Sequence, residues 1–225
     1  MRINGISSMA TRQILAALCK RFEEKTGASV SIEAMGGVDA ARVVREGRAT
    51  DVVILASDVM SRLEAEGFIV AGGVTGIARS LMGIAVRAGT PHPDISSADA
   101  VKRVVAAAPR VGYSTGPSGD HLLRLCEQWG LSEGDRLVKA PPGSPVASLV
   151  AQGKADLGFQ QWSEVMNVQG VEIVGPLPPE IEAVTVFAAG VAVASRQAEA
   201  TRAFIDFLAS RDGDDVRRAH GMDPC

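Results

Sequence analysis

Helical and extended patterns alternate along the whole sequence. The apolar segment from Ile3 to Ile6 is followed by a helical pattern that ends at Thr26-Gly27, and the extended segment Ser29 to Ala34 comes next. A second helical pattern then leads into the apolar segment Val52 to Leu55. This order predicts an α/β fold with largely parallel sheets, because parallel strands need a crossover helix between them.

The second half of the chain continues the alternation. Glycines stand where helical patterns end, as they do after many helices. The predicted elements are a helix from Ser97 to Ala108, a strand from Val111 to Tyr113, a helix from Ser118 to Trp129 closed by Gly130, and strands from Leu157 to Phe159 and from Thr185 to Ala194.

Residue type predicts where several helices begin. Asp, Ser and Thr are preferred before the first helical turn, and proline is tolerated at the first helical position. We therefore expect Asp39 to cap the helix after Gly36-Gly37, Ser57 or Asp58 to cap the next one, and Ser144-Pro145 to begin a later one.

The C-terminal segment is too short to hold a core of its own. It is expected to pack on the first part of the chain, which predicts a two-lobed architecture with two crossover segments. The predicted lobes are residues 1–79 plus 189–225 and residues 80–188. The cleft between two such lobes is the expected place for a ligand.

Composition excludes several classes of partner. The net charge is −3 and only 4% of the residues are aromatic, which argues against a nucleic-acid partner. The longest uncharged apolar run, Ala183 to Ser195, is too short to span a membrane. As written, the chain shows no signal peptide, so it is expected in the cytoplasm, or in the periplasm if a leader has been removed. A monomer is expected.

The cysteines and histidines do not form a metal-binding pattern. Cys19, Cys126 and Cys225 have no CxxC spacing and no ligand spacing to a histidine. We expect reduced thiols, no metal and no cofactor.

Three strand-to-helix turns carry the donors that anions prefer. They contain Ser7-Ser8, Gly36-Gly37, and the segment from Ser114 to Gly119 with Thr115 and Ser118. Backbone N–H groups at the positive end of a helix, together with neutral hydroxyls, favour an anion. Serine and glycine are also common caps, so it is their combination that predicts a binding site for a small anion.

The segment Gly112-Tyr113-Ser114-Thr115-Gly116 also matches the GxSxG turn of serine hydrolases. The match is weakened because Pro117 follows at once and the partner histidine would have to be His220. A serine hydrolase is therefore a third hypothesis, behind the two given below.

Four further polar residues are candidates for the same site. Gln160 and Gln161 end a predicted strand, where their amides can bind a carboxylate. His121 and Glu164 stand in first turns of predicted helices, and either could act as a general base.

The sequence resembles the type II periplasmic-binding-protein superfamily, in its molybdate-binding-protein-like branch. The resemblance covers nearly the whole chain and lies in segments that occur in the family's order. These are Ser7-Ser8, Gly36 to Val38 before Ala41-Arg42, Gly47 to Ser57, Gly153 to Phe159, Phe204 to Ser210, and Gly221-Met222.

Two departures affect what the resemblance implies. Gly36-Gly37-Val38 stands where molybdate binders carry a Gly-Ser-Ser turn, and Phe187 stands in the place of a ligand-binding tyrosine. The segments Tyr113 to Gly119, Phe159 to Glu164 and Val174 to Pro178 are instead similar to a subgroup that includes bacterial aconitate isomerases. That subgroup implies a carboxylate ligand.

Two hypotheses follow. The first is a solute-binding protein that holds a small anion, either a carboxylate or a molybdate-like oxyanion, and that would serve an ABC transporter permease if exported. The second is an isomerase of an unsaturated polycarboxylate such as aconitate, in which His121 or Glu164 moves a proton between allylic carbons.

Overall fold

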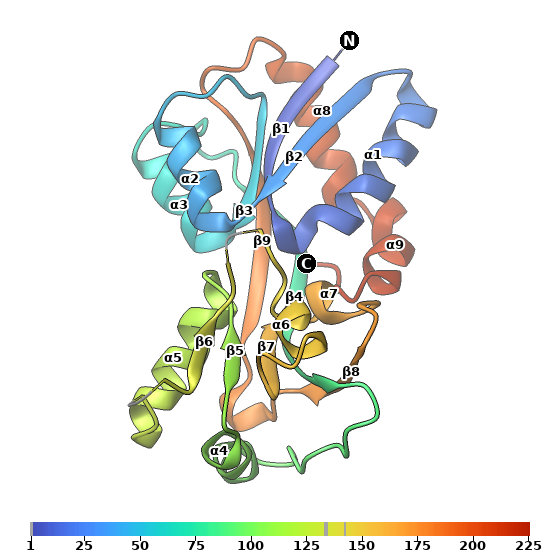
Figure 1. Cartoon of the computed structure of the whole chain (residues 1–225). Helices are drawn as coiled ribbons and strands as arrows, with labels where there is room; N and C mark the ends of the chain where they lie inside the picture. Colours follow the sequence, from blue (N-terminus) through green and yellow to red (C-terminus); the bar gives the residue numbers. More distant parts are fainter. Residues whose placement is uncertain (1, 133–134, 142) are drawn as a thin grey trace. The chain divides into compact units, whose positions relative to one another are not determined.

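The computed structural model describes residues 2–132, 135–141 and 143–225. The chain divides into two compact units. Unit 1 consists of Met1–Ser80 and Val186–Cys225, and unit 2 is the continuous stretch Leu81–Thr185. The fold is mixed α/β, as the alternating patterns predict (Figure 1).

Unit 1 is built around three parallel strands. β1 (Arg2–Ser8) lies between β2 (Ser29–Met35) and β3 (Val52–Ala56) and pairs in parallel with both. The helical elements of this unit are η1 (Met9–Thr11), α1 (Arg12–Thr26), α2 (Gly37–Arg45), α3 (Ser57–Ala65), α8 (Ala198–Ala209), η3 (Arg211–Gly213) and α9 (Asp214–Ala219).

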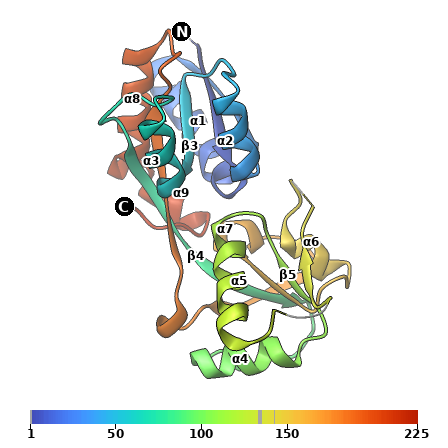
Figure 2. The same ribbon diagram turned by 90° about the vertical axis from the view of Figure 1, so that its left-hand side faces the viewer.

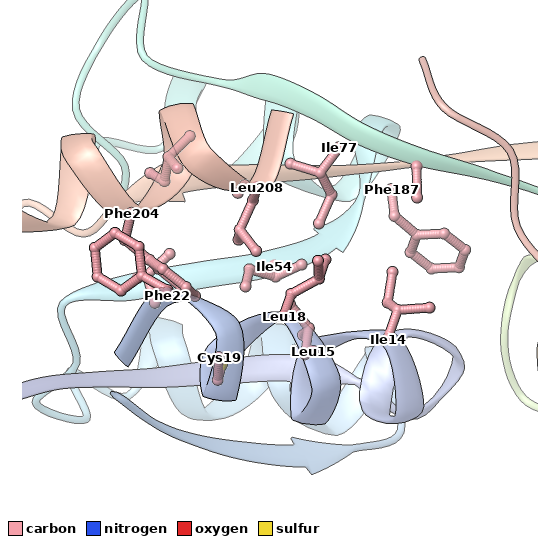
Figure 3. Close-up of a cluster of buried hydrophobic side chains, with 14 of the residues drawn as sticks. Ile14, Leu15, Leu18, Cys19, Phe22, Ile54, Ile77, Phe187, Phe204 and Leu208 are labelled. Carbon is pink, nitrogen blue, oxygen red and sulfur yellow. The ribbon is translucent and has the colours of Figure 1, made fainter. Parts of the chain in front are cut away.

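Apolar residues cover both faces of these strands. On one face, Ile3 and Ile54 pack with Leu15 of α1 and Phe204 of α8, and Figure 3 shows this cluster. On the other face, the cluster contains residues of β1, β3, α2 and α3. Figure 1 shows α2 and α3 beside β3. The strands are therefore buried on both sides, which agrees with their continuous apolar character.

Unit 2 contains a second set of parallel strands. β5 (Val111–Tyr113) pairs in parallel with β6 (Leu137–Lys139) and β7 (Leu157–Gln161). Residues of α4 and α5 pack on one face with Phe159, and α6 contributes residues to a separate cluster. Figure 2 shows α5 and α6 on opposite sides of β5. The helical elements are α4 (Ala98–Ala107), α5 (Pro117–Trp129), α6 (Val146–Ala151), α7 (Trp162–Val165) and η2 (Pro179–Ile181).

Two long strands belong to both units. β4 (Thr75–Arg87) and β9 (Val184–Val191) each cross a unit boundary, and β8 (Val171–Pro176) pairs with β4. β9 is antiparallel to β3, and β4 is antiparallel to β7. Hydrogen bonds consequently join the strands into one path, β2-β1-β3-β9-β4-β7-β5-β6, where separate and largely parallel sheets were expected.

Three predicted caps are wrong. The residue before α2 is Gly36 and the one before α3 is Ala56, so Asp39, Ser57 and Asp58 lie inside the first turns. Likewise, α6 begins at Val146, after Pro145. No residue separates β3 from α3 and only Gly36 separates β2 from α2, which residue type alone does not reveal.

A buried arginine holds the C-terminal helices in place. Arg217 of α9 is 1% exposed and donates to the carbonyl oxygens of Ile77, Leu208 and Ser210 and to the Asp214 carboxylate. Burial lowers the pKa of its guanidinium. One side chain thus satisfies the last carbonyl groups of α8 and links them to β4.

The three cysteines are free; Cys19 and Cys126 are buried, and Cys225 is exposed. Burial raises the pKa of the Cys19 thiol to about 12. Within the described residues, none of the helices is both long enough and apolar enough to cross a membrane.

Candidate functional site

The parallel strands of unit 1 end side by side, and a helix begins at each end. β1 ends at Ser8, β2 at Met35 and β3 at Ala56, and the register pairs Ser8 with Met35 and Ser7 with Ile54. The N-termini of η1, α2 and α3 therefore meet at one edge of the sheet, where backbone donors collect.

Of the helices at this edge, α2 and α3 have no side-chain caps. Gly36 before α2 has φ −55° and ψ 138°, and Ala56 before α3 has φ −58° and ψ 140°. Neither helix has a side-chain hydrogen bond at its N-terminus. The first-turn N–H groups of α2, beginning at Gly37, therefore remain available to an anion.

Ser7 and Ser8 differ in their access to this edge. Ser7 is fully buried, and its hydroxyl donates to the Ser8 carbonyl oxygen at 3.4 Å. The Ser8 hydroxyl accepts from the Ala10 N–H at 3.4 Å, which leaves its own O–H able to donate. Ser8 is therefore the better placed of the two to contact a ligand.

Phe187 belongs to the core. It is 1% exposed, and Figure 3 shows its ring among the apolar side chains of the cluster that contains Ile14 and Ile77. It is paired with Ala56 at the end of β3. The Phe187 ring therefore packs in the apolar core, and its side chain has no polar atom that could bind an anion.

A second edge of this kind lies in unit 2, at the ends of β5 and β7. Helix α5 begins there with Pro117, has no side-chain cap, and carries Ser118 and Gly119 in its first turn. Pro117 has no N–H, and the N–H groups of the next two residues precede the first intrahelical bond, which runs from Asp120 to Gly116. Two backbone donors and one hydroxyl therefore lie at the positive end of a long helix.

The Ser114 segment folds closely against this helix. The hydroxyls of Ser114 and Ser118 lie 3.1 Å apart, and Ser118 is 2% exposed. A Cβ on Gly119 would come within 1.8 Å of the Ser114 carbonyl oxygen. Gly119 is thus required by packing, while the ligand contacts of Ser114, Thr115 and Ser118 stay predictions.

The two neighbouring glutamines have different surroundings. Gln160 Oε1 accepts from the Val146 N–H at 2.6 Å, and its Nε2 donates to Glu164 Oε1 at 2.8 Å. Its amide therefore caps α6 and binds a carboxylate of its own chain. The predicted ligand contact of Gln160 stays a prediction, and the structure offers no free atom for it.

Gln161 is paired at one end of its amide only. Its Nε2 donates to Thr185 Oγ1 at 2.7 Å, whereas Oε1 is buried and has no partner among the described residues. Thr185 was not predicted as a site residue, because it lies 24 positions away at the beginning of β9.

The candidate bases, His121 and Glu164, also form hydrogen bonds within the chain. His121 Nε2 lies 3.0 Å from the Ile181 carbonyl oxygen, so Nε2 carries the proton and Nδ1 can accept one. Glu164 receives the Gln160 hydrogen bond described above. His220, the partner required by a serine hydrolase, donates from Nδ1 to the Val216 carbonyl oxygen, and Ser114 Oγ contacts Ser118 instead.

Carboxylates also occupy the first turns at the unit 1 edge. Asp39 of α2 pairs with Arg42 at 3.3 Å, and Asp58 of α3 pairs with Arg62 at 2.8 Å. These arginines offset the carboxylates locally, so the edge keeps its character as a donor surface. At both edges, the donors nearest the strand ends are neutral.

Comparison with known proteins agrees with this architecture. A curated aconitate isomerase from Pseudomonas sp. is 33% identical over 227 residues, covering 97% of this chain and 86% of that protein. Two solved structures have the same fold. The Azotobacter vinelandii periplasmic molybdate-binding protein has a TM-score of 0.81 at 19% identity, with 98% of each chain covered.

The second structure is the tungstate ABC transporter protein from Geobacter sulfurreducens, with a TM-score of 0.76 at 15% identity and coverage of 96% of this chain and 97% of that one. A family model described as bacterial extracellular solute-binding protein matches residues 3–223. The strands described above lead to the uncapped N-termini of α2, α3 and α5, and the chain belongs to the family of bacterial extracellular solute-binding proteins.

Proposed function

We propose that the protein binds a small carboxylate anion. The observation that carries the proposal is the first turn of α5, where the backbone donors of Ser118 and Gly119 and the paired hydroxyls of Ser114 and Ser118 stand together without a side-chain cap. Ser8, Gly36 and Gly37 are the corresponding candidates in unit 1.

The number of donors favours a carboxylate over a tetrahedral oxyanion. The four oxygen atoms of molybdate or sulfate surround one centre and need donors on all sides of it once water is removed, whereas each carboxylate group has two oxygen atoms and needs donors on one side only. Val38 and Phe187 carry no hydroxyl, and Ser7 is buried with its hydroxyl on a carbonyl group. These features support a ligand whose charged groups each need fewer donors.

A thermal-shift panel tests the proposal. Citrate, succinate and aconitate should each be compared with molybdate and sulfate, and binding should then be measured by calorimetry. A ligand at one hundred times its Kd stabilises the folded state by about 2.7 kcal/mol, which such a panel detects. Stabilisation by molybdate alone would contradict the proposal.

Two variants assign the ligand to α5. Ser118→Ala removes a hydroxyl beside the uncapped N–H groups and should weaken carboxylate binding about tenfold, as expected for one charge-assisted hydrogen bond. Ser31→Ala, at an exposed position of β2, is the control and should leave binding unchanged.

A second candidate function is isomerisation of aconitate, favoured by the 33% identity to an aconitate isomerase. Removal of a C–H proton and its return to the other allylic carbon need a base, for which Glu164 and the Nδ1 atom of His121 are the candidates. Proton exchange between aconitate and D₂O, followed by NMR, tests this. Exchange lost in Glu164→Gln or His121→Asn would support it, and binding without exchange would exclude it.

The family's description also supports a place and a partner. We propose that the protein works outside the cytoplasmic membrane and delivers its ligand to an ABC transporter permease, since its family is extracellular and a structural neighbour belongs to such a transporter. Co-purification with a permease in detergent tests the partner.

A further inference from the structure

Gln161 is a buried side chain with one unused polar atom. The residue is 2% exposed, its Nε2 donates to Thr185, and Oε1 is closed off from solvent without a partner among the described residues. Buried acceptors are nearly always satisfied in folded proteins. A missing partner at such an atom therefore points to a group that the chain itself does not supply.

The neighbouring glutamine shows that the chain satisfies a buried amide where only structure is needed. Gln160 is also 2% exposed, and both ends of its amide have partners in the chain, the Val146 N–H and the Glu164 carboxylate. The two side chains differ in no property except their surroundings. The unpaired atom is therefore specific to the position of Gln161.

The position of Gln161 places it on the side of the sheet that carries the proposed carboxylate site. It is the last residue of β7, two residues beyond Phe159, so both side chains lie on the same face of the sheet. Phe159 packs with Leu122 and Cys126 of α5. Gln161 thus lies on the α5 side, at the end of the sheet where α5 begins.

We propose that the ligand carries a hydroxyl group beside its carboxylate, and that Gln161 Oε1 accepts a hydrogen bond from this hydroxyl. The inference rests on the proposed carboxylate site and adds the class of ligand, a hydroxycarboxylate. A carbonyl oxygen repels the oxygen atoms of a second carboxylate and pairs with an O–H donor. The donors at the beginning of α5 would bind the ligand carboxylate, and Gln161 Oε1 would bind the ligand hydroxyl.

Thr185 is the positioning residue in this arrangement. Its hydroxyl accepts from Gln161 Nε2 at 2.7 Å, which occupies the donor end of the amide and leaves the acceptor end for the ligand. Thr185→Ser keeps this hydroxyl, whereas Thr185→Val removes it at nearly constant volume. The serine variant should therefore retain the selectivity that the valine variant loses.

Ligands that differ only by a hydroxyl test the inference on the unmodified protein. Malate should be compared with succinate, and citrate with tricarballylate, by calorimetry. A site that pairs a buried polar atom with a ligand hydroxyl rejects the analogue that lacks it. We expect the hydroxylated member of a pair to bind at least about tenfold more tightly.

Variants then assign the selectivity to Gln161. Gln161→Leu should bring the two members of a pair to within about twofold by weakening the hydroxylated one, because the acceptor is gone. Ser118→Ala should weaken both members and keep their ratio. Melting curves without ligand verify that each variant is folded.

The outcomes separate the two proposals. Equal binding of malate and succinate, and of citrate and tricarballylate, by the unmodified protein would overturn the hydroxyl inference and leave the carboxylate site standing. Tighter binding of aconitate than of citrate would also overturn it, because aconitate has no hydroxyl. Binding of none of these acids would overturn both proposals.

Discussion

The carbonyl oxygen of Ser114 lies where a side chain on Gly119 would have to be. A Cβ at that glycine would approach it to 1.8 Å, and the carbonyl carbon to 2.7 Å. Only glycine lets the segment after β5 fold back onto the first turn of α5. The position of the Ser114 hydroxyl therefore depends on the absence of a side chain five residues later.

Gly119→Ala should consequently damage both stability and binding. The methyl group must push the Ser114 backbone away, which should lower the free energy of unfolding by about 1–3 kcal/mol and separate the Ser114 and Ser118 hydroxyls. Gly116→Ala is the matched control, since a Cβ there meets nothing within 4 Å. Urea unfolding of both variants measures the difference, and equal stability would contradict the packing argument.

A negative charge at the beginning of α2 should have opposite effects on folding and binding. Gly37→Asp places a carboxylate at an uncapped helix N-terminus, which should stabilise the protein by about 0.3–1 kcal/mol. The same charge should repel an anionic ligand and weaken its binding about tenfold.

Gly37→Asn is the neutral control for this change. It has nearly the same shape, and a Cβ at Gly37 meets nothing within 4 Å. Melting temperature and ligand affinity should therefore move in opposite directions for the aspartate only. If the aspartate leaves affinity unchanged, the α2 N-terminus does not contact the ligand.

Replacing Arg217 should lower the free energy of unfolding more than replacing most other charged residues. Arg217→Met leaves the carbonyl oxygens of Leu208, Ser210 and Ile77 without their donor in a buried place, and the expected loss is about 3 kcal/mol. Arg218→Met changes an exposed neighbour and should alter stability by less than about 0.5 kcal/mol. Chemical denaturation of both variants decides this, and similar losses would contradict the role given to Arg217.

The ion pair between α1 and α9 predicts a dependence of stability on pH. The Arg21 guanidinium lowers the pKa of the Asp215 carboxyl from 3.8 to about 2. A lowered folded-state pKa contributes stability above pH 4, and this contribution is lost as the pH falls from about 4 to about 2.

Asp215→Asn removes this contribution. The stability difference between the unmodified protein and the variant should be present at pH 7, shrink between pH 4 and pH 2, and decrease in high salt, because the pair is exposed. Denaturation at several pH values provides the measurement. A difference that persists unchanged at pH 3 and below would show that the carboxylate is not its source.

Local signals explain why much of the fold is predictable. Gly27 and Gly130 end their helices with φ of 70° and 69°, a conformation that glycine adopts without strain, and such residues are visible in the sequence. Pro117 likewise marks the beginning of α5. The apolar residues of α1 and α8 lie on the faces that their spacing indicates.

Long-range contacts explain what the sequence does not reveal. Gln160 and Gln161 are adjacent and identical, yet one caps α6 and the other reaches Thr185, because successive side chains of a strand point to opposite faces. The burial of Arg217 depends in part on the carbonyl group of Ile77 in β4, 140 positions away along the chain. Residue type gives no sign of either contact.

The boundaries of the two units indicate where segments of this chain can be removed or exchanged by recombination. Unit 2 is one uninterrupted stretch, whereas unit 1 is made of two pieces that meet where β4 and β9 run as neighbouring strands. A short linker from Ser80 to Val186 would close unit 1 into a single polypeptide, and residues 81–185 could be exchanged as a cassette. Recombination at these two points would graft a new ligand preference onto the same N- and C-terminal framework.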